Sequence, residues 1–309
     1  YPPVPQNRDR YADNFFSWVR DFDGDGFGDV LVVGFPGTPA YVYRNPGSAV
    51  ADAKTAHWEK RQVLDWVSNE SPQFTDLVGD AGEELVCTRD GFFGFATVNQ
   101  EDPFDAWTFH AVSEHIAPKK VGHGLGVGDV NGDGRNDILF SGGWFEQPQS
   151  NPESGRWKRH EVSFSESYGG ADMYAYDVDG DGDNDILTSH AAHDFGLGWY
   201  EQIDDNGKIG FRHHLIMGDR PERNAYGLVI SELHSVALAD MDGDGLKDLI
   251  TGKTYWSHHR QSPMWNADPV VYWFRLVRGE EGVDWVPYQA GNESGIGRQL
   301  SVRDLNNDG

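Results

Sequence analysis

Short apolar segments separated by polar turns make up almost the whole chain. The apolar runs are two to four residues long, as at 30–33, 138–140 and 249–250, and aromatic segments such as 41–43 and 272–274 follow them. Runs of this length are typical of β-strands, and no helical periodicity of useful length accompanies them. The pattern therefore predicts an all-β protein built from short strands.

A nine-residue loop rich in Asp and Gly recurs between these strands. The copy at Asp76 is degenerate, and the copy at Asp304 is truncated by the end of the chain. Four short strands per unit of about 50 residues are the signature of a β-propeller. We expect a single propeller domain over residues 1–309, with six or seven blades and most simply seven when complete, and we interpret the chain as trimmed relative to the closed wheel. The six copies begin at Asp21, Asp76, Asp129, Asp177, Asp240 and Asp304.

The loop carries oxygen ligands at positions 1, 3, 5 and 9 and, in its well-formed copies, glycines at positions 4 and 6. Oxygen donors on a flexible loop suit Ca²⁺, whereas Mg²⁺ demands tighter octahedral geometry. An Asp/Gly turn without metal is the alternative, and recurrence at blade spacing argues against it. Val78 replaces a ligand in the degenerate copy, which we expect to bind weakly or not at all. The predicted calcium ligands are Asp21, Asp23, Asp25, Asp29, Asp129, Asn131, Asp133, Asp137, Asp177, Asp179, Asp181, Asp185, Asp240, Asp242, Asp244, Asp248, Asp304, Asn306 and Asp308.

Through these loops the chain resembles the FG-GAP/VCBS-repeat family of calcium-loop propellers over essentially its whole length, with integrin α heads as distant relatives. Segments 122–129, 143–148 and 233–240 look like secreted bacterial VCBS-repeat proteins. Those proteins are in turn similar to the propeller domain of fungal aldos-2-ulose dehydratase, a zinc-dependent sugar lyase whose cupin domains have no counterpart here. The resemblance implies a propeller fold, but this fold hosts adhesion modules, lectins and lyases alike.

The charge balance restricts the partners and the compartment. The chain has 50 Asp and Glu against 25 Lys and Arg, a formal net charge of −25. This excess argues against nucleic acid and against anionic membrane surfaces, and no apolar run is long enough for membrane insertion. Loops of this kind need millimolar calcium, which predicts a secreted, periplasmic or extracellular protein. The single cysteine, Cys87, excludes an internal disulfide.

Strand length places several side chains on the face opposite the calcium loops. Six residues before a loop correspond to about 20 Å of strand, so a side chain there lies at the top mouth of the central channel. Loops 189–194 and 252–259, which leave the second strand of their units, emerge on the same face. The first group comprises Glu70, His123, His234 and Arg298, and the two loops add His190, His193, Lys253, Tyr255 and His258.

Two classes of function fit this face. The first is a carbohydrate lyase or dehydratase acting by β-elimination, with His123 or His234 as base and Tyr255 as acid. Lys253, Arg298 or a zinc ion would stabilise the enolate, and we expect His123, His193 and His234 to be the zinc ligands unless they lie more than ~10 Å apart. The second is a non-catalytic module that binds glycan or protein, as integrin-like adhesion modules do. We expect carbohydrate or glycan as the partner and further domains outside this chain, although the second class also admits a protein partner. The expected substrate contacts are Glu70, Trp144, His190, Trp256 and His258.

Overall fold

The computed structural model describes residues 14–49, 57–80, 82–165, 169–254 and 261–306. Within these ranges the chain forms 20 β-strands and one short 3₁₀ helix, η1 (Gly47–Ala49), and no α-helix. The expectation of an all-β protein is confirmed. The chain divides into two compact units: unit 1 comprises residues 1–122 and 148–157, and unit 2 comprises residues 123–147 and 158–309.

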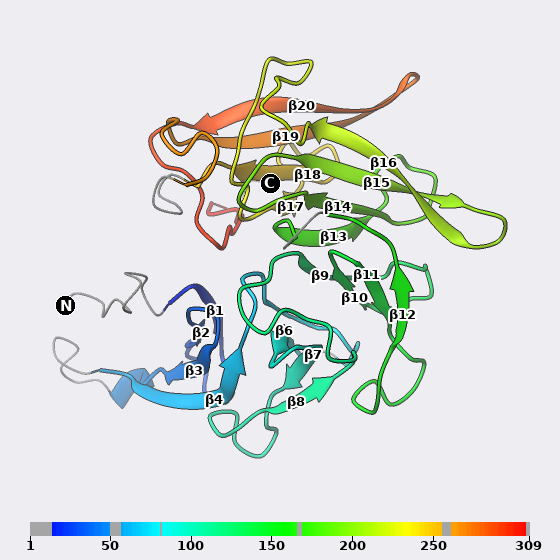
Figure 1. Cartoon of the computed structure of the whole chain (residues 1–309). Helices are drawn as coiled ribbons and strands as arrows, with labels where there is room; N and C mark the ends of the chain where they lie inside the picture. Colours follow the sequence, from blue (N-terminus) through cyan, green and yellow to red (C-terminus); the bar gives the residue numbers. More distant parts are fainter. Residues whose placement is uncertain (1–13, 50–56, 81, 166–168, 255–260, 307–309) are drawn as a thin grey trace. The chain divides into compact units, whose positions relative to one another are not determined.

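Unit 1 contains two four-stranded antiparallel sheets, each made of strands that are consecutive in the chain (Figure 1). The calcium-type loop at 21–29 joins the first two strands of the first sheet, and the degenerate loop at 76–84 does so in the second. The first sheet has the order β1 (Phe16–Arg20), β2 (Asp29–Val33), β3 (Thr38–Arg44), β4 (Glu59–Val67), and the second β5 (Gln73–Thr75), β6 (Glu84–Arg89), β7 (Phe92–Thr97), β8 (Thr108–Ala111).

Unit 2 repeats the same four-stranded plan three times. Two of the repeats merge into one eight-stranded sheet because their first strands, β9 and β13, pair in parallel. The third repeat forms a separate sheet. The strands are β9 (Leu125–Gly128), β10 (Asp137–Phe140), β11 (Gly143–Glu146) and β12 (Lys158–Glu161); β13 (Asp172–Tyr176), β14 (Asp185–Ser189), β15 (Leu197–Asp204) and β16 (Ile209–Met217); and β17 (Ala237–Ala239), β18 (Asp248–Gly252), β19 (Val271–Gly279) and β20 (Gly282–Gly291).

The second strand of each repeat is the most deeply buried, as in β10, β14 and β18, where every residue is buried. A strand covered on both faces reads as a continuous apolar run, which explains the runs seen in the sequence. The outer strands, such as β12, alternate or are largely exposed. The described residues of unit 1 include a large apolar cluster, and those of unit 2 include two, so each unit has a core of its own.

Aromatic residues of the third strand face histidines of the fourth strand. Trp144 stacks on His160 with ring centroids 3.9 Å apart, and Trp199 stacks on His214 at 4.4 Å. Each pair is directly opposite in the strand register. The recurring Trp-x-x-His histidines are therefore architectural in these two repeats, as their periodicity indicates.

Candidate functional site

Three histidines from separate segments come together in unit 2. His123 lies two residues before β9, His234 lies three residues before β17, and His193 lies in the loop between β14 and β15. Their ligand atoms are all within 4.8 Å of one another, and their ring centroids are 4.9 to 5.7 Å apart. Nitrogens on one tetrahedral zinc are roughly 3.3 Å apart, given Zn–N bonds of about 2 Å. Small side-chain rotations therefore suffice for the three to share one ion.

Hydrogen bonds fix the orientation of His234, which is 1% exposed. Its Nδ1 lies 3.2 Å from the carbonyl oxygen of Glu232 and 3.0 Å from Oγ1 of Thr254. Because a carbonyl oxygen can only accept, we assign the ring proton to Nδ1, which leaves the Nε2 lone pair for a metal. This carbonyl–imidazole arrangement is the usual support of a metal-binding histidine.

The segment that carries His234 is held from both neighbouring sheets. Asp172, at the start of β13, accepts hydrogen bonds from the Ser235 hydroxyl and the Val236 N–H, each at 3.1 Å. From the other side, the Thr251 hydroxyl donates to the Ser235 carbonyl at 2.7 Å. Burial raises the pKa of Asp172 to about 6. The histidine is thus on a rigid support although the segment is not a regular strand.

A buried ion pair lies directly beside this segment. The Lys253 ammonium is 3.6 Å from a carboxylate oxygen of Glu232, and the two side chains are 2% and 1% exposed. Lys253 also donates to the carbonyl oxygen of Thr254 at 3.1 Å. Glu232 has φ of 63°, a left-handed conformation that is uncommon for a non-glycine residue. Unpaired charges are rarely buried so deeply, so each of these residues requires the other.

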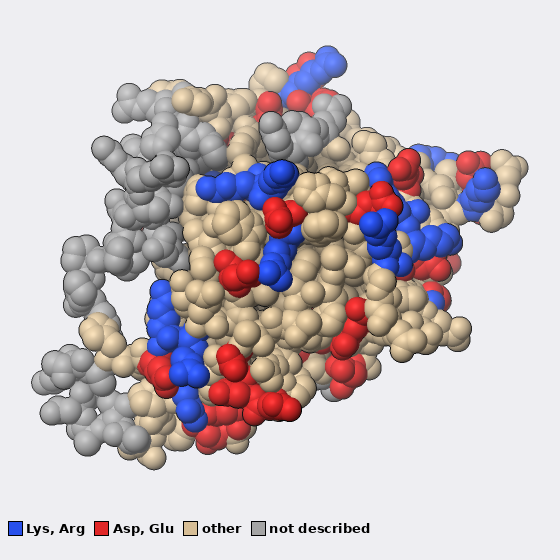
Figure 2. Space-filling view, turned by 60° about the horizontal axis from the view of Figure 1, so that its bottom comes forward, with Lys and Arg blue, Asp and Glu red and all other residues tan. Residues whose placement is uncertain are grey.

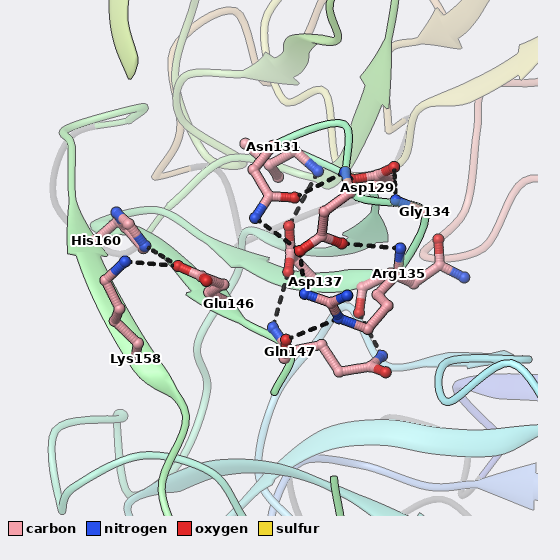
Figure 3. A network of polar contacts seen from close by, with 12 residues as sticks. Asp129, Asn131, Gly134, Arg135, Asp137, Glu146, Gln147, Lys158 and His160 are labelled. Carbon is pink, nitrogen blue, oxygen red and sulfur yellow. Dashed lines mark hydrogen bonds and ion pairs between the residues drawn. The ribbon is translucent and has the colours of Figure 1, made fainter. Parts of the chain in front are cut away.

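The calcium-type loops have the turn geometry that their glycines predict. The glycines at positions 4 and 6 have φ between 70° and 98° in the four well-formed copies. Carboxylates at positions 1, 3 and 9 lie within 4.8 Å of one another in the loops that begin at Asp21, Asp177 and Asp240. In the loop that begins at Asp129, position 3 is Asn131, whose amide contributes its oxygen and nitrogen to the network in Figure 3.

The ninth residue of each loop does more than the sequence indicated. Asp137 is fully buried, and its two oxygens accept hydrogen bonds from the N–H groups of Val130 and Gln147 (Figure 3). Asp137 thereby links the calcium-type loop to the segment that directly follows β11. We call this link the clamp. Burial raises its pKa to about 7, and the pKa of Asp185 likewise. Both carboxylate oxygens are bound in the same way in Asp29, Asp185 and Asp248.

Arginines neutralise part of the loop charge. Arg275 pairs with Asp242 at 2.6 Å and with Asp244 at 3.1 Å, and Arg44 pairs with Asp23 at 2.8 Å. Figure 2 shows the same interspersion of basic and acidic side chains in several places on the face drawn. The acidic excess is therefore divided among local ion pairs and clustered loop carboxylates.

A groove of about 600 Å³ lies in unit 2 beside β16 and β20. Its lining combines the aromatic rings of Trp199, Trp285 and Tyr226 with the carboxylates of Glu201 and Asp284. Tyr226 is 47% exposed and donates its hydroxyl proton to Asp284. Trp199 and Trp285 are each 5% exposed, so of these three rings only Tyr226 has an open face. An exposed aromatic ring beside carboxylate acceptors matches the apolar ring faces and hydroxyl groups of sugars.

The remaining predicted site residues are distributed as follows. Trp144 is 1% exposed and stacked on His160, so it has no open face for a sugar ring. His190 is buried, and its Nε2 lies 3.0 Å from Nε2 of His213. Sequence analysis did not identify this partner. Glu70 is a buried residue of unit 1 and Arg298 is half-buried in unit 2, and their convergence on the histidines stays a prediction. Tyr255, Trp256, His258 and Asp308 lie outside the described residues.

Sequence reasoning missed the groups that support the histidines, namely Glu232, Thr254, Asp172 and Ser235. One signal was present, since Glu232 is the only charge in the otherwise apolar or small run 227–233. A single charge inside a segment that must be buried indicates a partner, here Lys253. The hydroxyl and carboxyl contacts of the other three had no sequence signal, because they depend on how neighbouring sheets meet.

Comparison with known proteins places the fold but not the family. No family model matches the chain, and no curated protein matches it. Among solved structures, the chain is similar to a lectin of Agrocybe aegerita described as recognising non-reducing terminal N-acetylglucosamine. The match has a TM-score of 0.51 at 16% identity over 92% of this chain and 67% of the lectin. It is also matched to the V. cholerae biofilm matrix protein Bap1, with a TM-score of 0.38 at 17% identity over 90% of this chain and 39% of that one.

No helix among the described residues is both long and apolar enough to cross a bilayer.

Proposed function

We propose that this protein is a secreted, calcium-stabilised β-propeller of the FG-GAP/VCBS-repeat type that binds carbohydrate. The repeated four-stranded sheets, each with its loop between the first and second strands, support the propeller, which we expect to have seven blades when complete. The clustered carboxylates support calcium in the loops, where oxygen-only donors suit that ion. The likeness in fold to a lectin supports glycan as the ligand.

The observation that carries the site is the convergence of His123, His193 and His234. Three neutral imidazoles leave one coordination position of a zinc ion open, and an open position can take a sugar hydroxyl or carbonyl oxygen. Among the residues of this chain, Glu232 and Thr254 orient the imidazole of His234. The groove beside β16 and β20 offers a second contact surface for a longer glycan, through Tyr226 and the carboxylates of Glu201 and Asp284.

The test measures metal content and glycan binding together. Purified protein exposed to zinc and calcium should hold one zinc per chain at this site, and His193→Asn should lose that ion while keeping calcium and fold. Binding to an array of glycans, N-acetylglucosamine-terminated ones included, should weaken at least tenfold in His193→Asn and not in His115→Asn, an exposed histidine of unit 1. Unchanged glycan binding in His193→Asn would contradict a metal-dependent site, and loss of binding in Tyr226→Ala would instead assign recognition to the groove.

A sugar lyase is the second candidate, and the buried Lys253–Glu232 pair beside His234 favours it. In a β-elimination a base removes the proton α to a carbonyl or carboxylate, the β C–O bond breaks, a C=C bond forms and the leaving oxygen is protonated. Lys253 would stabilise the enolate charge. His123 and His234 cannot coordinate zinc and act as the base at once, so the metal-binding arrangement favours recognition over catalysis.

Turnover separates the two candidates. Keto-sugars and uronates should give no conjugated product, followed by ultraviolet absorbance, if the protein only binds glycan. Product formation that disappears in Lys253→Met/Glu232→Gln, a variant without the unpaired buried charge and with its fold verified by circular dichroism, and that persists in His115→Asn would establish the lyase.

A further inference from the structure

His190 and His213 form a second pair of histidines, separate from the three that carry the proposed function. His190 follows β14 and is 7% exposed, whereas His213 is on β16 and is exposed. The two Nε2 atoms are 3.0 Å apart, with ring centroids 4.7 Å apart and ring planes at 64°. Both residues lie in the repeat formed by β13 to β16 of unit 2.

The separation of the two nitrogens matches shared coordination of one ion. With metal–nitrogen bonds of about 2.05 Å, two imidazole nitrogens 3.0 Å apart subtend an angle of roughly 94° at the metal. Opening the pair by a few tenths of an ångström reaches the tetrahedral angle. The alternative is a direct N–H···N hydrogen bond, which uses the same two atoms and a single proton.

Glycines in and directly before β15, the strand between the two histidines, leave room for the two imidazole rings to approach each other. Gly198 of β15 lies beneath both rings, and a Cβ at that position would be 2.8 Å from Nε2 of His190 and 2.9 Å from Nε2 of His213. A Cβ at Gly196 would be 2.6 Å from Nδ1 of His190. Any larger residue at either glycine would push the imidazoles apart. Tyr200, the cross-strand partner of His213, stacks on its ring at 4.5 Å and fixes its orientation.

Burial is the largest influence on both imidazoles and lowers their pKa values, which favours the neutral form that binds metals. The carboxylate of Asp219, in the exposed loop after β16, acts on both imidazoles in the opposite direction and offsets part of this effect. His214 is the other titratable group that acts on His213, and it is engaged with Glu201. Burial lowers the pKa of His190 to about 4, so this imidazole is neutral near pH 7 and releases no proton when it binds a metal.

We propose that His190 and His213 form a binding site for one late divalent transition-metal ion such as Zn²⁺, Ni²⁺ or Cu²⁺, with water completing the coordination. Imidazole nitrogens select this class over Ca²⁺ and Mg²⁺, which prefer oxygen. The exposure of His213 leaves the remaining coordination positions open to water. The site is distinct from the calcium loops and from the histidine trio, and it does not depend on the proposed function.

Copper titration of the full chain tests the proposal, with Ca²⁺ present to saturate the loops. In the His193→Asn variant, which lacks the other histidine site, the chain should bind one Cu²⁺ whose electron paramagnetic resonance spectrum shows nitrogen coordination. Adding His213→Asn should weaken that binding at least tenfold, and adding His115→Asn should leave it unchanged. His213 is exposed, so its replacement leaves the core intact, and near-ultraviolet circular dichroism verifies the fold.

Two results would overturn the proposal. One is the absence of bound Cu²⁺ in His193→Asn, and the other is a bound ion that His213→Asn does not weaken. A wild-type chain that binds one Cu²⁺, lost in His213→Asn and kept in His193→Asn, would support this pair and contradict the histidine trio. The experiment can therefore contradict the histidine pair and the histidine trio independently of each other.

Discussion

Lys253 shows at the scale of a single residue how the candidate site is held. Its ammonium has been removed from water together with the Glu232 carboxylate. Lys253→Met leaves the Glu232 carboxylate buried without its counter-charge. Such a change typically lowers the free energy of unfolding by about 3–5 kcal/mol. Urea denaturation of the calcium-loaded protein measures this loss. Lys253→Met/Glu232→Gln should recover most of it, and a double variant as unstable as the single one would show that the pair is not the cause.

The ninth loop position makes a prediction at the scale of the element. In the degenerate loop, Glu84 keeps the loop half of the clamp, because one of its oxygens accepts hydrogen bonds from the N–H groups of Leu77 and Val78. Glu84→Gln should therefore destabilise the chain by about 1–3 kcal/mol, because buried N–H groups lose a charged acceptor. Asp76→Asn, at the half-buried start of the same loop, should change stability less. Thermal unfolding of the two variants under equal calcium compares them, and equal effects would contradict the clamp.

The contact between β13 and the His234 segment makes the stability depend on pH. Burial raises the pKa of Asp172 from 3.8 to about 6, so the folded state binds this proton more tightly than the unfolded state does. The resulting stabilisation is complete below pH 4 and is lost as the pH rises to 6. The loss amounts to at most about 3 kcal/mol. Urea unfolding at several pH values should show it, and Asp172→Asn should flatten that part of the profile. A parallel profile in the variant would exclude Asp172 as the group responsible.

Calcium should govern stability at the scale of the whole molecule. Four well-formed loops bring carboxylates and Asn131 together, and calcium bound only by the folded chain stabilises it by about 2.7 kcal/mol per site at one hundred times the dissociation constant. Chelation with EGTA should lower the Tm by many degrees, and added calcium should restore it. Magnesium at equal concentration serves as the control. A Tm that EGTA does not change, with no calcium bound at millimolar concentration, would contradict the calcium loops.

The sequence predicted periodic features well and unique contacts poorly. The loop at 129–137 and the buried strand after it repeat, so pattern and spacing were enough to place both. The approach of His123 and His234 followed from the length of a strand, and that of His193 from the face on which loop 189–194 emerges. Glu232 and Thr254 could not be placed, because their contacts arise where two sheets meet. Trp144 was misleading for a related reason: a core aromatic and a ligand-binding aromatic look the same in a sequence.

Possible metal ligands and loop shape are separate properties of the repeat. The loop at 76–84 has Val78 where the other copies have Asp or Asn, yet the carboxylate at its ninth position still binds the backbone of the turn. A repeat can therefore lack a metal ligand and still keep the backbone shape of its loop. During divergence of such chains, the number of ions held is free to change one repeat at a time while the architecture persists. Ion content is therefore a poor measure of how many repeats a relative contains, and the ninth residue is a better one.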